Sequence, residues 1–226
     1  MTQDQWIAAV ETGNLQMIID SHQHGANIRA SNAYALRYSS ENGNLEVVRY
    51  LVEHFVDIHT YEDYSLRLSS INGHLEVVRY LVEHGANIHA YSDASLRWSA
   101  NNNHFEVVRY LVEHGADIHT EQDYALRSSA RKGHINVVRY LVEHGADIHA
   151  NNDTALLWSS NNGHLNVVQY LVEHGANVKI GIGAAANQPN VLAWLEGYQQ
   201  ALKEQKQLLK HVKNTTQSPI FNKNRI

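Results

Sequence analysis

Histidine is the residue best suited to chemistry in this chain, with 16 copies among 226 residues and no cysteine. Imidazole nitrogens bind zinc, and they accept or donate protons near neutral pH. Most of these histidines recur at intervals of thirty residues and form three columns. The columns are His74, His104, His134 and His164; His59, His89, His119 and His149; and His54, His84, His114, His144 and His174. Whether a column can hold an ion depends on the elements that position it.

A thirty-residue repeat positions the three columns. Its signature is Leu75-Glu76-Val77-Val78-Arg79-Tyr80-Leu81-Val82-Glu83-His84-Gly85-Ala86, which returns nearly unchanged from Leu45, Phe105, Ile135 and Leu165. The valines and leucines of this run fall on one stripe of a helix, and Gly85 stands where a left-handed residue would end it. Asp93, like Asp63, Asp123 and Asp153, predicts the N-cap of a short second helix, over about residues 94–102. Such a unit buries its stripe only by stacking on copies of itself.

Stacked units leave little room for a metal or a nucleotide. Successive members of a histidine column would lie about 8–10 Å apart, whereas zinc needs its ligand nitrogens about 2 Å from one point. We therefore interpret the histidines as structural and predict no metal site. Gly181-Ile182-Gly183-Ala184-Ala185-Ala186 mimics a dinucleotide-binding pattern, but it lies between the last repeat and a capping helix rather than after a strand. No cofactor and no catalytic residue are expected.

The segment DASLRWSANNNHFEVVRYLVEHGADIHT, residues 93–120, resembles the ankyrin repeat. Its recurrent Leu, Gly-His, Val-Val and Gly-Ala positions return, with few exceptions, in the five central units, and the resemblance covers about residues 3–180. Three features depart from the family. The Thr-Pro pair is missing, the unit has thirty residues instead of about 33, and Arg37, Arg67, Arg97 and Arg127 replace a histidine. This thirty-residue variety is similar to the ankyrin arrays of giant amoeba viruses.

The resemblance implies an all-α ankyrin-repeat solenoid of stacked helix-turn-helix units with short inter-repeat loops. We predict a degenerate N-terminal capping repeat (1–30), five repeats (31–180), a C-terminal capping repeat with an extended helix (181–213) and a disordered tail (214–226). After Pro189, apolar residues spaced by four and three indicate one long helix. It should cap the array first and run past it from about Leu202. Phe55 replaces the usual glycine, so we predict a local distortion there.

The charge is distributed unevenly along the chain. Residues 1–195 carry 12 basic and 21 acidic side chains, a net charge of −9, while residues 196–226 carry six basic and two acidic ones, a net charge of +4. An acidic array lacks the basic surface that is typical of a nucleic-acid binder. No stretch approaches 18 apolar residues, and no secretion signal is recognisable. We expect a soluble cytoplasmic protein, in the host cytoplasm if it is viral, without nucleic-acid or membrane partners.

Positions that differ from unit to unit are released from the shared packing, and the resemblance places them on the concave side. Among them, aromatic side chains two residues after the recurrent leucine have two interpretations, packing between repeats or a contact stripe. Neutral sequence drift at surface positions without a packing constraint would give the same variation between units as partner binding. The predicted partner-binding residues are Tyr61, Glu62, Leu68, Ile71, Tyr91, Ser92, Trp98, Asn101, Glu121, Gln122, Arg131, Asn151, Asn152, Trp158 and Asn161.

These patterns predict a non-catalytic protein–protein interaction scaffold with an unidentified protein partner. The viral resemblance implies an adaptor that acts on host proteins. The alternative is a structural or self-associating element, with a weak homodimer through residues 195–212, where the heptad-like spacing continues.

Overall fold

The computed structural model describes residues 3–23, 32–54 and 56–216 of the chain. Every regular element in these residues is an α-helix, which confirms the predicted all-α class. The helices are α1 (Gln3–Glu11), α2 (Leu15–Gln23), α3 (Asn32–Glu41), α4 (Leu45–His54), α5 (Thr60–Asn72), α6 (Leu75–Glu83), α7 (Ala90–Asn101), α8 (Phe105–Glu113), α9 (Thr120–Lys132), α10 (Ile135–Glu143), α11 (Ala150–Asn161), α12 (Leu165–Glu173), α13 (Val178–Ala184) and α14 (Pro189–Thr216).

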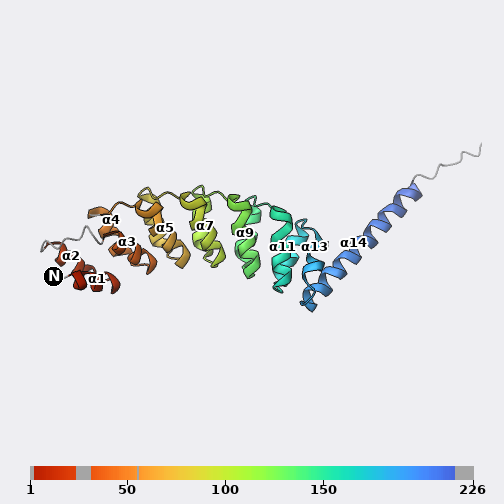
Figure 1. The fold of residues 1–226 in the computed structure, drawn as a ribbon. Helices are drawn as coiled ribbons and strands as arrows, with labels where there is room; N and C mark the ends of the chain where they lie inside the picture. The colour runs from red at the N-terminus through yellow and green to blue at the C-terminus, as the bar shows by residue number, and fades with distance from the viewer. Residues whose placement is uncertain (1–2, 24–31, 55, 217–226) are drawn as a thin grey trace, which may run out of the picture.

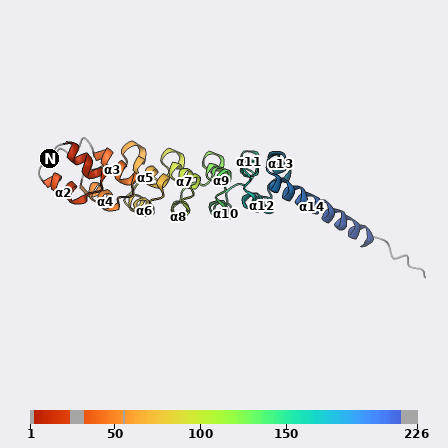
Figure 2. The same ribbon diagram turned by 90° about the horizontal axis from the view of Figure 1, so that it is seen from below.

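The helices form an elongated array with two rows (Figures 1 and 2). Helices α3, α5, α7, α9, α11 and α13 make one row, called here the inner row, and α4, α6, α8, α10 and α12 make the outer row (Figure 2). Neighbouring inner helices approach closely because small residues face each other, and Ser69, Ser70, Ser99 and Ala100 are fully buried. The repeat therefore does what its pattern predicts: it stacks as helix-turn-helix units.

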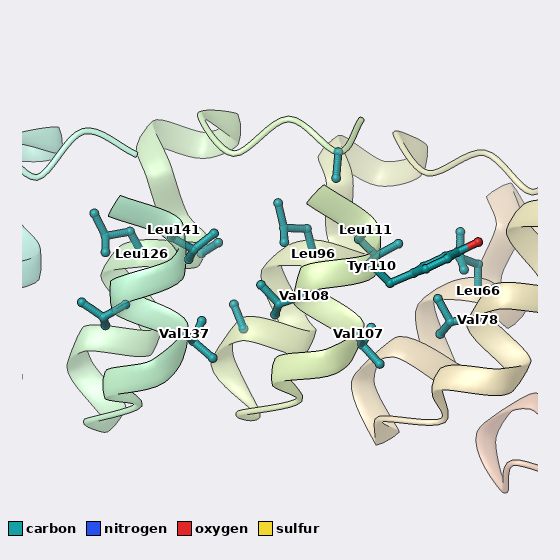
Figure 3. Close-up of a cluster of buried hydrophobic side chains, with 14 of the residues drawn as sticks. Leu66, Val78, Leu96, Val107, Val108, Tyr110, Leu111, Leu126, Val137 and Leu141 are labelled. Carbon is teal, nitrogen blue, oxygen red and sulfur yellow. The ribbon is translucent and has the colours of Figure 1, made fainter. Parts of the chain in front are cut away.

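The core lies between the two rows and is built from the same positions of each unit. In the unit of α7 and α8, Leu96 comes from the inner helix, and Val107, Val108 and Leu111 come from the outer helix (Figure 3). Each is buried, and burial of one such side chain stabilises the fold by about 1.5–3 kcal/mol. The buried residues form a single cluster from Trp6 to Leu195. The units consequently share one continuous core.

A left-handed turn opens each inner helix from α5 to α11. Residues 61–63, 91–93, 121–123 and 151–153 all have φ between 50° and 58°. Left-handed backbone costs an L-residue about 1–2 kcal/mol, so other contacts must hold the turn. The right-handed part of α7 begins at Ala94, close to the predicted short helix over residues 94–102.

The predicted helix-capping role of Asp63, Asp93, Asp123 and Asp153 is wrong. These buried residues are the last of each left-handed turn, and their carboxylates accept hydrogen bonds from the following unit. Asp63 Oδ1 accepts from the Asn87 N–H at 2.9 Å, and Asp153 Oδ1 accepts from the Asn177 N–H at 3.0 Å. Each aspartate thus connects one unit to the next across 24 residues of sequence.

Glycines end the outer helices as the sequence predicts. Gly85 has a φ of 97°, and a turn of this kind favours glycine because it lacks a Cβ. Asn103 occupies a left-handed position with a φ of 64°, where most other units have glycine. The predicted distortion at Phe55 lies outside the described residues, as do the loop between α2 and α3 (24–31) and residues 217–226.

The last two helices close the array and then extend beyond it. Val191 and Leu195 of α14 are fully buried, whereas residues 203–213 are exposed throughout. Both views show α14 projecting away from the stacked units (Figures 1 and 2). The structure thus agrees with a helix that caps first and overhangs from about Leu202. It continues to Thr216, three residues past the predicted boundary at residue 213.

Candidate functional site

The residues that differ between units gather on the inner row and on the loops that precede it. The loop pairs occupy the left-handed turns, and all eight are exposed: Tyr61, Glu62, Tyr91, Ser92, Glu121, Gln122, Asn151 and Asn152. The inner helices add Trp98, Arg131 and Asn161, which are exposed, and Ile71, Asn101 and Trp158, which are half-buried. We call this surface the inner face.

Leu68 does not belong to the inner face. Its side chain is only 8% exposed, so a partner could not reach it without moving the helix. Leu68 occupies the same repeat position as Trp98 and Trp158, and Ser128 at that position is also buried. Each of the two interpretations of this position therefore holds for some units. Leu68 and Ser128 pack between units, whereas Trp98 is exposed and could contact a partner.

Arginines from the inner helices hold the left-handed turns. Arg97 Nε donates to the Ser92 carbonyl at 2.8 Å, and its Nη2 donates to the Tyr91 carbonyl at 2.7 Å. Arg127 makes the same pair of bonds with the Gln122 and Glu121 carbonyls. Arg67 makes only one such bond, from Nη2 to the Tyr61 carbonyl at 3.2 Å, so the full fork of donors is formed by Arg97 and Arg127. The position is repeated in the sequence, but its partners in the turn could not be read from the repeat.

The arginines at this position also lie against aromatic rings, one of their own unit and one of the following unit. Arg67 is 4.6 Å from the ring centres of both Tyr64 and Tyr91. Arg127 lies 5.7 Å from the rings of Tyr124 and Trp158. Such contacts contribute about 0.5–1 kcal/mol each at exposed sites. They hold the exposed Tyr91 ring in place before any partner arrives.

One histidine column bonds each unit to the preceding one. Nε2 of His74, His104, His134 and His164 lies 2.8–3.0 Å from a backbone carbonyl 33 residues earlier, and we assign the ring proton to that nitrogen. The rings of His74, His104 and His164 each lie close to the glycine that ends the inner helix of the preceding unit. A Cβ on Gly73, for example, would lie 2.3 Å from His104 Nδ1. Burial lowers the pKa of His134, so the neutral ring is favoured.

The other two columns also bond to the protein itself. His59, His89, His119 and His149 place Nδ1 at 3.0–3.1 Å from the connecting aspartates. Nδ1 of His84 lies 2.7 Å from the Tyr80 carbonyl, and the two rings lie 3.9 Å apart. Among the described residues, no group of three histidine or carboxylate side chains could bind one metal ion together. The columns act as connections within and between units.

The dinucleotide-like glycines have a structural place as well. Residues 178–184 form α13, and Gly181 is buried where a Cβ would meet Leu195 at 3.1 Å. The segment follows a loop and an outer helix instead of the strand that the nucleotide motif requires. Gly181 thus lets Leu195 of α14 pack closely against α13.

The inner face carries negative charge along its loop edge. Asp57, Glu62, Asp117, Glu121 and Asp147 are all exposed there. Arg67, Arg97 and Arg127 lie beneath and bond to turn carbonyls. In the described part of the chain, no helix has both the length and the hydropathy to span a bilayer.

Comparisons with known proteins agree with this architecture. The family model described as ankyrin repeats (3 copies) matches residues 6–92, 57–122 and 96–182. The crystal structure of the human ASB11 ankyrin repeat domain matches with a TM-score of 0.66 and 21% identity, over 72% of this chain and 82% of that chain. At this identity the likeness concerns the fold alone. No curated protein matches the chain.

Proposed function

Because this chain belongs to the ankyrin repeat family, whose members are generally protein–protein interaction modules, we propose that it is a non-catalytic scaffold whose inner face binds a protein partner. One observation carries the proposal. Tyr61 and Tyr91 are 64% and 63% exposed and Trp98 is 38% exposed, all on the face where the units differ. Exposed tyrosine and tryptophan are favoured anchors at interfaces.

The arginine contacts beneath the turns support the same face. A side chain that is already ordered loses less conformational freedom on binding, so less of the interaction energy is spent on ordering it. Tyr91 is positioned in this way by Arg67, and its carbonyl is held by Arg97. The outer helices, in contrast, repeat almost the same sequence and offer no comparable variation. A selective partner would therefore engage the inner face.

The finer parts of the proposal concern setting and partner class. The resemblance to the arrays of giant amoeba viruses leads us to place the protein in the host cytoplasm, as an adaptor for host proteins. The net charge of −9 over residues 1–195 supports a protein partner over nucleic acid.

A comparison of matched variants tests this proposal. The full chain and a Tyr61→Ala/Tyr91→Ala/Trp98→Ala variant are each used to capture proteins from amoebal cytosol, followed by mass spectrometry and titration calorimetry with any captured protein. A Glu76→Ala/Arg109→Ala variant, altered on the outer row, is the control. We expect one partner that binds the wild type and the control and is lost from the triple variant. Equal capture by all three chains would exclude the inner face.

Self-association is the second candidate function, and α14 motivates it. Leu208 and Leu209 are 67% and 56% exposed on the overhanging part of the helix. Light scattering of the full chain against a chain that ends at residue 200 separates the two functions. A dimer mass for the full chain alone would favour association through residues 195–212, and identical monomer masses would exclude it.

A further inference from the structure

A pocket of about 420 Å³ opens on the inner face between the turns of α5 and α7. Its lining includes the exposed Glu62 and Tyr91, the histidines His59 and His89, and the buried Asp63. We call it the Asp63 pocket. It adjoins the two most exposed tyrosines of the chain, Tyr61 and Tyr91.

Asp63 has an unused carboxylate oxygen at this pocket. The residue is 4% exposed, and its Oδ1 accepts from the Asn87 N–H at 2.9 Å and lies 3.1 Å from His59 Nδ1. Among the described residues, none donates a hydrogen bond to Oδ2. Oδ2 is not among the fully enclosed unpaired polar atoms of the described residues, so a donor placed in the pocket can reach it.

The next unit shows what is missing. There Asp93 has the same place, and its Oδ2 accepts a hydrogen bond from Thr120 Oγ1 at 3.1 Å. The residue that corresponds to Thr120 beside Asp63 is Ala90, which cannot donate. Asp123 also faces an alanine, Ala150, but its neighbours are Gln122 and Asn151 in place of Glu62 and Tyr91. Within the described residues, only the Asp63 pocket combines the free oxygen with a second carboxylate and an exposed aromatic ring.

We propose that the Asp63 pocket binds a lysine or arginine side chain of the protein partner. The cation would donate to Asp63 Oδ2, and the attraction between two opposite charges adds to this bond, whereas the Thr120 hydroxyl that donates to Asp93 is uncharged. The Glu62 carboxylate and the Tyr91 ring add attraction for the same charge. Arg67 contacts the Tyr91 ring, but its Nη2 donates to the Tyr61 carbonyl at 3.2 Å. This inference rests on the proposed function and specifies the partner's chemistry.

NMR titration of the full-length ¹⁵N-labelled chain tests the pocket without a known partner. The probe is Nα-acetyl-arginine amide, and its neutral counterpart, Nα-acetyl-citrulline amide, controls for shape. The Asn87 amide reports on Asp63 because it donates to Oδ1. The Asp117 amide, which donates to the satisfied Asp93, is the internal reference. We expect a saturable shift at Asn87 with arginine amide, and none at Asp117 or with citrulline amide.

The decisive variant is Ala90→Thr, which reproduces the Thr120 hydroxyl beside Asp63. It should be at least as stable as the wild type, so a loss of binding could not be attributed to unfolding. We expect its affinity for arginine amide to fall by about tenfold or more, since one charge-assisted bond is worth that factor. Equal shifts with citrulline amide, or unchanged affinity in Ala90→Thr, would overturn the inference. In either case, loss of the captured partner from the Tyr61, Tyr91 and Trp98 variant would leave the proposed function standing.

Discussion

At the scale of single residues, the recurrent arginine compensates for a backbone that its own sequence does not favour. Tyr91, Ser92 and Asp93 are left-handed although none is glycine, and Arg97 donates to the first two carbonyls. The unit of α11 has Leu157 at the arginine position, and its turn is Asn151-Asn152. Asparagine tolerates left-handed backbone better than most residues. The chain thus uses two solutions to the same conformational problem.

Removal of an arginine fork should therefore destabilise the array. We expect Arg97→Ala to lower the free energy of unfolding by about 1–2 kcal/mol, since two hydrogen bonds from a charged group are lost. Arg109→Ala, on the exposed outer row, should cost less than about 1 kcal/mol. Adding Tyr91→Asn and Ser92→Asn to Arg97→Ala should recover part of the loss. Urea unfolding followed by circular dichroism measures the stability of all three variants. Equal losses for Arg97→Ala and Arg109→Ala would contradict the role of Arg97 in stabilising the left-handed turn.

His134 makes the stability of the array depend on pH in a defined direction. Burial holds the pKa of His134 below its ordinary value of 6.5, so the unfolded chain binds a proton first as pH falls. The contribution of neutral His134 is complete above pH 6.5 and is lost as pH falls toward the folded pKa. We expect His134→Gln to weaken this loss, because Gln188 donates the equivalent bond to the Asn161 carbonyl at 3.1 Å without titrating.

Urea unfolding at pH values above and below 6.5 compares the wild type with His134→Gln. The variant should show the smaller decrease in stability on acidification. Parallel pH profiles for the two chains would assign the dependence to other groups.

At the scale of the elements, the turn of one unit and the loop of the next form a joint. Asp93 Oδ1 accepts from the Asp117 N–H at 2.9 Å, and Asp93 Oδ2 accepts from Thr120 Oγ1. We expect Thr120→Ala to lower the free energy of unfolding by about 1 kcal/mol, and Ala90→Thr to raise it by a similar amount. Chemical denaturation of the two reciprocal variants checks this. Changes of the same sign in both would show that the hydroxyl is not what matters.

The elements themselves could be predicted because their causes lie inside one unit. The stripe of Val77, Val78 and Leu81 and the glycine that follows determine an outer helix from a dozen neighbouring residues. The joint between units could not be predicted in the same way. Asp63 looked like a helix cap because its bond to Asn87 spans 24 residues and joins different units. The exposure of Trp98 and the burial of Leu68 likewise depend on neighbours that one unit does not contain.

At the scale of the whole molecule, the two rows of helices contribute differently to packing and to the variable surface. The outer row repeats a nearly constant stripe, so it supplies the shared core, and the inner row supplies the differences. The two most exposed aromatic side chains of the described residues, Tyr61 and Tyr91, lie in the turns of α5 and α7, which favours a partner that contacts a few adjacent units instead of the full length. Repeat proteins allow this division because each unit contacts mainly its neighbours.

The last helix should separate into a part that stabilises the array and a part that does not. Val191 and Leu195 are buried against the array, and each contributes about 1.5–3 kcal/mol by leaving water. Residues 203–213 are exposed and should contribute little to the fold. We expect a chain that ends at Leu202 to keep the urea midpoint of the full chain, and one that ends at Asn187 to lose stability markedly because the last units become open to water. Equal destabilisation by both truncations would mean that the overhang belongs to the folded core.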